Sequence, residues 1–169
     1  MDGSIRIARE LARIARLLVA SDSIDPAFIS RLCRKVNGRR GYAFGGDCGM
    51  FALGMCRFLS EHGFSGMKIV FSIENGWEDD TTAEELATEE VDVYHVSFKV
   101  GENTYDGDGL GDANLKSIAL EEYGDSSPTI LEFDWDDPNV RRAITANTDY
   151  GNTDTAFHDE AVRRYGEMA

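Results

Sequence analysis

The sequence from residue 91 to residue 106 is VDVYHVSFKVGENTYD, and the expected architecture follows from this stretch. Apolar residues occupy the even positions from 94 to 100, whereas His95, Ser97 and Lys99 occupy the odd positions. Alternation with a period of two is typical of a strand with one buried face. Gly101 and Glu102 interrupt the alternation as a turn, and a second strand is expected to end at residue 106. The stretch therefore predicts an antiparallel hairpin with a histidine on its polar face.

The length of the turn decides which carboxylate lies near that histidine. If the turn holds two residues, His95 pairs with Asp108, and Asp106 lies diagonal to it on the same face. If the turn holds three residues, the parity of the second strand is reversed and both acids leave that face. The pattern alone leaves Asp106 and Asp108 open as partners of His95.

The rest of the chain supplies helices and further strands for one domain. The 169 residues, 42% of them hydrophobic, are enough for a single substantial core. We expect strands over 67–73 and 129–133. We expect helices over 4–20, 26–36, 48–62, 82–88, 113–123, 139–146 and 156–167. The predicted fold class is α+β, with an antiparallel sheet packed against the helix that begins at Cys48 and with extra N- and C-terminal helices.

Cys48 is the candidate nucleophile because it follows a glycine-rich loop and opens an apolar helix. The positive end of the helix dipole and the unpaired amides of the first turn favour the thiolate, which is the nucleophilic form. Gly46 and Gly49 leave room for a substrate carbonyl, and the backbone N–H of Cys48 can donate to an oxyanion. The alternative is that Cys48 is a small buried residue at a helix start, as free cysteines often are.

Three histidines could serve as the base for this thiol. His62 falls at the C-terminus of the 48–62 helix, where a cation is favoured without any catalytic role. His158 stands near the start of the last predicted helix and has no identifiable partner. His95 lies on a central strand and has nearby carboxylates that could orient its ring and stabilise its charged form. We therefore expect His95 to be the base.

These residues resemble a known group of enzymes. The pattern Gly46-Asp47-Cys48-x-x-Phe51-Ala52 resembles the nucleophile helix of transglutaminase-like proteins in the papain-like superfamily. The stretch from His95 to Asp106 resembles the histidine strand, turn and aspartate strand of the same group, including its smaller bacterial and phage members. The resemblance covers roughly residues 45–110. It implies a Cys48 nucleophile, a His95 base and an Asp106 orienter, acting by acyl transfer through a thioester.

The expected activity is therefore acyl transfer or hydrolysis at the amide of a peptide, an isopeptide or a glutamine side chain, with a protein or peptide as substrate. Papain-like proteases usually place a glutamine upstream of the cysteine as an oxyanion donor, but this chain contains no glutamine. Tyr42, six residues before Cys48, is the candidate substitute. No cofactor and no metal are expected.

The charge of the chain limits its partners. The formal net charge is −14, but residues 1–47 carry nine Lys or Arg against five Asp or Glu. The acidic body should repel nucleic acid and anionic membranes. The three cysteines do not suggest a disulfide framework, and no signal core or long apolar run is visible, so a cytoplasmic location is expected, or the host cytoplasm or virion for a viral protein.

Residues 1–22 are expected to form an amphipathic helix with an apolar stripe and four arginines on the opposite side. This helix either packs on the 23–169 domain as a surface helix or binds a partner as a detachable or targeting segment. The second possibility goes with an alternative function, a catalytically inactive protein of the same fold that uses the basic helix for interaction.

Two acidic segments have their own alternatives. Residues 74–92 carry nine acids and no base, and we expect an exposed insertion that is either a solvated charge run or a surface that steers a cationic substrate. Asp106, Asp108 and Asp112 lie in a glycine-rich loop of the kind that binds calcium. Ser117, however, stands where a calcium loop has its bidentate glutamate.

Overall fold

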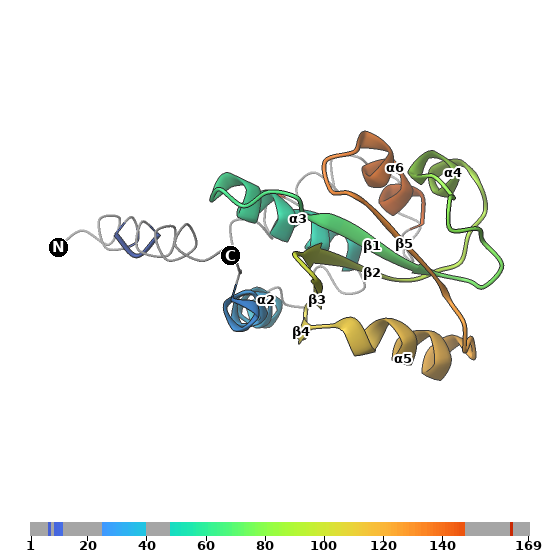
Figure 1. Cartoon of the computed structure of the whole chain (residues 1–169), viewed down its shortest axis with the longest axis horizontal. Coiled ribbons are helices and arrows are strands. Elements are labelled where there is room, and N and C mark those ends of the chain that lie inside the picture. Colours follow the sequence, from blue (N-terminus) through green and yellow to red (C-terminus); the bar gives the residue numbers. More distant parts are fainter. Residues whose placement is uncertain (1–6, 8, 12–24, 40–47, 148–162, 164–169) are drawn as a thin grey trace.

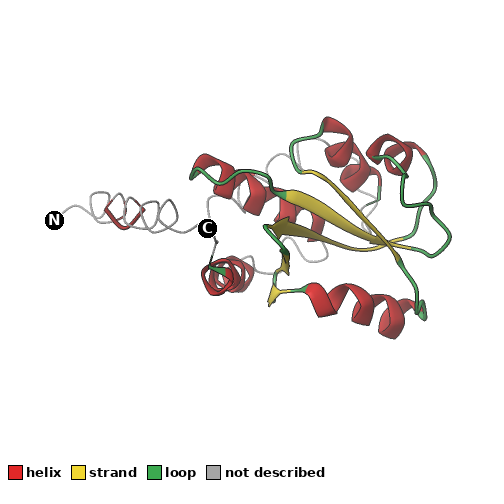
Figure 2. Cartoon of the chain, viewed as in Figure 1, coloured by secondary structure: helices red, strands yellow, loops and turns green. Residues whose placement is uncertain are grey.

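The computed structural model describes residues 7, 9–11, 25–39, 48–147 and 163, and it has an α+β fold built on a five-stranded antiparallel sheet (Figures 1 and 2). The strands lie in the order β4-β3-β2-β1-β5. The strands are β1 (Lys68–Ile73), β2 (Val93–Val100), β3 (Asn103–Asp106), β4 (Gly109–Leu110) and β5 (Thr129–Asp134). The helices are α2 (Pro26–Arg39), α3 (Cys48–Glu61), α4 (Ala83–Thr88), α5 (Asp112–Tyr123) and α6 (Pro138–Ala146). The predicted α+β class and antiparallel sheet are confirmed.

The hairpin between β2 and β3 has the two-residue turn. Lys99 pairs with Thr104 and Val100 with Asn103, so only positions 101 and 102 lie between the strands. Gly101 adopts a φ of 60°, a left-handed conformation that glycine tolerates without the steric cost of a side chain. Asp106 is therefore on the same face of the hairpin as residue 95.

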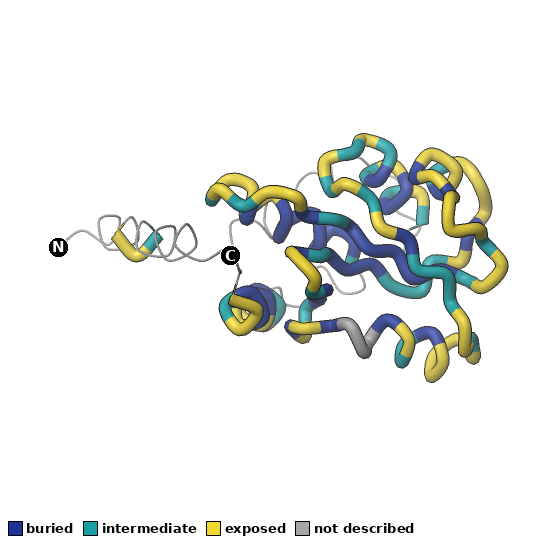
Figure 3. Tube along the Cα trace, in the orientation of Figure 1, coloured by how far each residue is buried: buried dark blue, intermediate teal, exposed yellow. Residues whose placement is uncertain are grey.

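One face of the sheet forms the main core with α3. Alternate residues of β1 and β2, such as Phe71 and Phe98, are fully buried in one cluster with the apolar side of α3. On the other face, Val70 of β1 is also buried. Lys99 of β2 forms an ion pair with Glu132 of β5 at 2.9 Å, and this pair spans β1 on the face that carries Val70. Figure 3 shows that burial follows the central strands, while the outer loops are exposed.

Two predicted helix ends were tested by the structure. The helix that begins at Pro26 was expected to stop before Asn37 and Gly38, but α2 continues to Arg39. Tertiary packing overrides the local stop signal there, because the Asn37 side chain is half-buried against Gly107. The end of α3 was predicted within one residue: Gly63 has a φ of 88° and the N–H of Phe64 bonds back to the carbonyl of Leu59.

The acidic segment 74–92 is only partly the exposed insertion that was expected. Its short helix α4 begins with a capping box between Thr82 and Glu85, and eight of the nine acidic residues are exposed. Its apolar residues Ala83, Leu86 and Val91, however, belong to the main core. Figure 1 shows α4 beside α6, and the side-chain amide of Asn147 donates to the Leu86 carbonyl at 2.9 Å. The segment is thus integrated into the domain.

Several expectations fall outside the described residues. These include most of the N-terminal helix, Tyr42 in the loop before Cys48, and most of the last helix with His158. The described residues of the N-terminal segment are helical, and Ile7 is 62% exposed although it belongs to the predicted apolar stripe. In the part of the chain that the structure describes, no helix combines the length and the apolarity that crossing a membrane would require.

Gly49, the second residue of α3, allows α6 to approach closely. A Cβ at this position would lie 2.6 Å from Cγ2 of Ile144. We expect Gly49→Ala to destabilise the fold by about 1–3 kcal/mol, because overpacking against a stiff β-branched side chain outweighs the roughly 1 kcal/mol gained in helix propensity. Urea unfolding would measure the change.

The matched control is the double variant Gly49→Ala, Ile144→Ala. Removing the Ile144 side chain leaves a cavity and is itself costly, but the added methyl should then be tolerated. The two substitutions should therefore cost less together than the sum of their separate costs. A Gly49→Ala variant as stable as the wild type would contradict this interpretation of the contact.

Candidate active site

Cys48 is the first residue of α3 and lies at the edge of the core. It is half-buried, while the following residues Gly49, Met50 and Phe51 are buried. Its sulfur therefore stands at the N-terminus of a 14-residue helix, in the field of the first-turn amides. Cys33 and Cys56, in contrast, are both completely buried in the core.

His95 joins this thiol to a carboxylate. Its Nε2 lies 3.2 Å from Oδ2 of Asp106, and its side chain is also hydrogen-bonded to Cys48. The imidazole therefore interacts with both of the other residues.

Asp106, and not Asp108, is the acid beside His95. The Asp106 side chain is 7% exposed, and its second oxygen, Oδ1, accepts the backbone N–H of Asp108 at 2.9 Å. The side chain of Asp108 is exposed. The strand β3 ends at Asp106 and the chain turns into β4 at Gly109, so residue 108 does not pair with β2, whereas Asp106 lies diagonal to His95 on the same face.

The strand that carries His95 is fixed on both sides of it. Ser72 of β1 lies opposite His95, and its buried hydroxyl donates to the Leu115 carbonyl of α5 at 3.4 Å. The preceding residue, Tyr94, stacks on Tyr123 with ring centroids 4.3 Å apart, and its hydroxyl donates to Asp125. These contacts attach α5 to the sheet next to the site and restrict the movement of His95.

The electrostatics favour a charged imidazole. Burial alone would lower the pKa of His95, but the hydrogen bonds to Asp106 and Cys48 and the negative charges of both residues raise it from 6.5 to about 10. His95 therefore carries a proton at neutral pH when its two partners are anionic. Burial raises the pKa of Cys33 to about 12, with a contribution from the charge of Asp106, and also raises that of Cys56. These two thiols stay protonated and unreactive.

This arrangement has the parts that acyl transfer requires. A sulfur at a helix N-terminus can attack a carbonyl, an imidazolium beside it can donate a proton, and a carboxylate fixes the ring and its charge. The described residues contain no group of three or more His, Cys, Asp or Glu side chains that could hold a metal ion. Both oxygens of Asp106 are already hydrogen-bonded, to His95 and to the backbone of residue 108.

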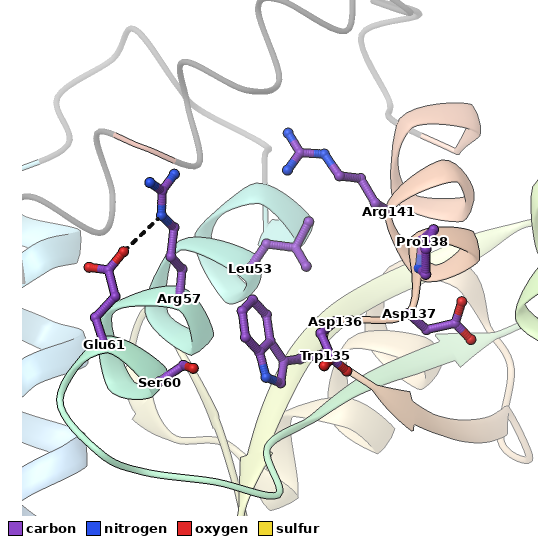
Figure 4. Close-up of a pocket in the computed structure, with 9 residues that line it drawn as sticks. All are labelled: Leu53, Arg57, Ser60, Glu61, Trp135, Asp136, Asp137, Pro138 and Arg141. Atoms are coloured by element: carbon purple, nitrogen blue, oxygen red, sulfur yellow. Dashed lines mark hydrogen bonds and ion pairs between the residues drawn. The ribbon is translucent and has the colours of Figure 1, made fainter.

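A hollow of about 460 Å³ lies elsewhere on α3, and the sequence did not point to it. Figure 4 shows Leu53 and Trp135 inside it and Arg57 and Arg141 on its two sides, from α3 and α6. Arg57 is nine positions beyond Cys48, which places it about 180° around the helix from the cysteine. The hollow is thus separate from the candidate active site. Its residues are far apart in the chain, so no local motif could have revealed it.

No protein-family model, no curated protein and no solved structure matches this chain.

Proposed function

We propose that the protein catalyses cysteine-dependent acyl transfer or hydrolysis at an amide through a thioester intermediate. The observation that carries the proposal is the placement of His95 between Cys48 and Asp106. The order of the three residues in the chain, and the helix and antiparallel strands that bear them, also support a relationship to the papain-like superfamily and its transglutaminase-like members.

In the first half of the reaction, the Cys48 thiolate attacks the carbonyl carbon of the amide. A carbon–sulfur bond forms, and the electron pair of the carbonyl moves to its oxygen, which the backbone N–H of Cys48 can stabilise. When this intermediate collapses, the carbon–nitrogen bond breaks. His95 gives its proton to the departing amine, so the amine leaves neutral and the acyl group stays on the sulfur.

In the second half, an acceptor attacks the thioester. His95, now neutral, takes a proton from the attacking water or amine while the carbonyl accepts the electron pair. The carbon–sulfur bond then breaks, and the thiolate and the imidazolium are restored. Water as acceptor gives a hydrolase or a deamidase, whereas an amine gives a transglutaminase. Asp106 holds the same ring orientation throughout.

A chloroacetamide probe tests whether the site is active before any substrate is known. We expect the probe to label Cys48 at pH 6 and to leave Cys33 and Cys56 unlabelled, because both are completely buried. Peptide mass spectrometry after labelling would identify the modified thiol. The Cys48→Ala variant should take up no label at any position.

Unfolded protein in urea provides the reference rate for an ordinary thiol. If Cys48 in the folded protein reacts no faster than in urea at pH 6, the enzymatic function is refuted. The alternative, an inactive interaction protein, would then be preferred, and the 62% exposure of Ile7 on the basic N-terminal segment favours it.

A further inference from the structure

The loop that follows Asp106 contains three glycines with very little space around them. A Cβ on Gly107 would lie 2.9 Å from Cγ and Oδ1 of Asn37. A Cβ on Gly109 would lie 3.2 Å from Arg34 Nη1. Gly107 and Gly109 therefore mark places where the loop touches the side chains of α2, whereas a Cβ on Gly111 would lie 3.1 Å from Cγ of Asp106.

The contacts on α2 come from one side of the helix. Arg34 and Asn37 are three positions apart, and Ser30, one turn before Arg34, contacts the position of a Gly109 Cβ at 3.3 Å. This stripe of α2 lies directly on the loop, and α2 packs against β3 and β4 on each side of it. The helix therefore supports the chain segment immediately after the candidate acid.

Asn37 is unusual within this stripe. Its Oδ1 is buried and finds no hydrogen-bond partner among the described residues. A buried carbonyl oxygen without a partner is unfavourable and calls for an explanation beyond hydrogen bonding. The explanation that the contacts offer is shape, because the amide fills the space against Gly107, the neighbour of Asp106.

We propose that Asn37 is a positioning residue, which fixes Asp106 against His95 by holding the backbone at Gly107. This inference rests on the proposed function of the Cys48–His95–Asp106 site. Gly107 has no positive φ, so alanine does not strain its backbone, and the three atoms nearest to a methyl group there all belong to the Asn37 side chain. A substitution at 107 thus changes this contact without straining the turn.

A double-mutant cycle on positions 37 and 107 tests the proposal. We expect Gly107→Ala to displace the loop and to slow iodoacetamide alkylation of Cys48 at pH 6 about tenfold, the effect of one pKa unit. In the Asn37→Ala background the same methyl has room, and its further effect should be less than about twofold. Asn37→Leu keeps the shape of the side chain and should react within about twofold of the wild type.

NMR titration of His95 provides a second readout, which general loss of stability would not produce. The imidazole of Gly107→Ala should titrate at lower pH than that of the wild type, because Asp106 no longer supports its charge. Arg31→Ala, on the exposed side of α2, should change neither the rate nor the titration. Thermal unfolding would verify that each variant is folded at the temperature of the assay.

Two results would overturn the proposal. One is a Gly107→Ala protein with an unchanged rate and an unchanged His95 titration. The other is an equal effect of the methyl with and without the Asn37 side chain. If wild-type Cys48 reacts like an unfolded thiol, the proposed function fails, but the His95 titrations still decide whether Asn37 and Gly107 position Asp106.

Discussion

His95→Ala is expected to slow the alkylation of Cys48 at pH 6 by about 100-fold. An ordinary thiol with a pKa near 8.5 is less than about 1% thiolate at this pH, and a neighbouring cation favours the thiolate form. The pKa of His95 is raised to about 10, so its imidazole provides such a cation beside Cys48. Removing the imidazole leaves Cys48 with only the helix N-terminus to favour its anion. Iodoacetamide labelling followed by mass spectrometry of the three cysteine peptides would give the rate for each thiol.

His62→Ala is the matched control for this experiment. His62 is also half-buried, but its Nδ1 lies 2.7 Å from the Phe58 carbonyl at the end of α3, more than three helical turns from Cys48. Its removal should leave the Cys48 rate within about twofold of the wild type, as expected of a surface substitution remote from the site. Equal rates in His95→Ala and wild type would exclude His95 as the partner of the thiol.

Asp106→Asn is expected to lower the pKa of His95 and to reduce acyl transfer by at least about 100-fold. The structure predicts the direction of the pKa change. Burial opposes the charge on His95, and Asp106 is one of the two groups that overcome this effect. Without the carboxylate, the NMR titration midpoint of His95 should move down from about 10 toward its ordinary value of 6.5. An asparagine can also present its amide to Nε2 and favour the wrong tautomer.

The variant Asp108→Asn tests whether the effect on His95 is specific to Asp106 or is shared by another nearby carboxylate. Asp108 contacts Asp106 through its backbone N–H, which the substitution retains, and its own side chain is exposed. The titration of His95 and the reactivity of Cys48 should therefore stay close to those of the wild type. A large effect at position 108 with a small one at 106 would show that the acid has been wrongly identified.

The hairpin illustrates how much of the site could be predicted from the sequence. Alternation from 94 to 100 defined the polar face that carries His95, and the glycine after it defined the turn. The sequence alone did not decide between Asp106 and Asp108, because the choice depends on which side chain reaches His95 across the two strands. Cys48 was recognisable because a helix start after glycines has a local signature.

Other features depended on contacts between distant segments. Asn37 and Gly38 carry a local signal for the end of a helix, but packing on Gly107 extends α2 through them. The sequence did not reveal that apolar residues of 74–92 join the core, because many acids surround them in the chain. Leu86 is nevertheless fully buried. The hollow beside Trp135 combines residues from α3 and α6, and no sequence period connects those two helices.

The close approach of Ile144 to Gly49 bears on how this protein could be shortened. The segment from 45 to 110 contains all three site residues, yet the first turn of α3 rests on α6, and β1 is completed by β5 on its outer side. A fragment limited to that segment would expose the side of α3 that α6 covers and would leave the edge of β1 unpaired. The elements β5 and α6 are therefore part of the smallest unit that could hold the nucleophile in place, and grafting the three residues with their own helix and hairpin would not transfer the site.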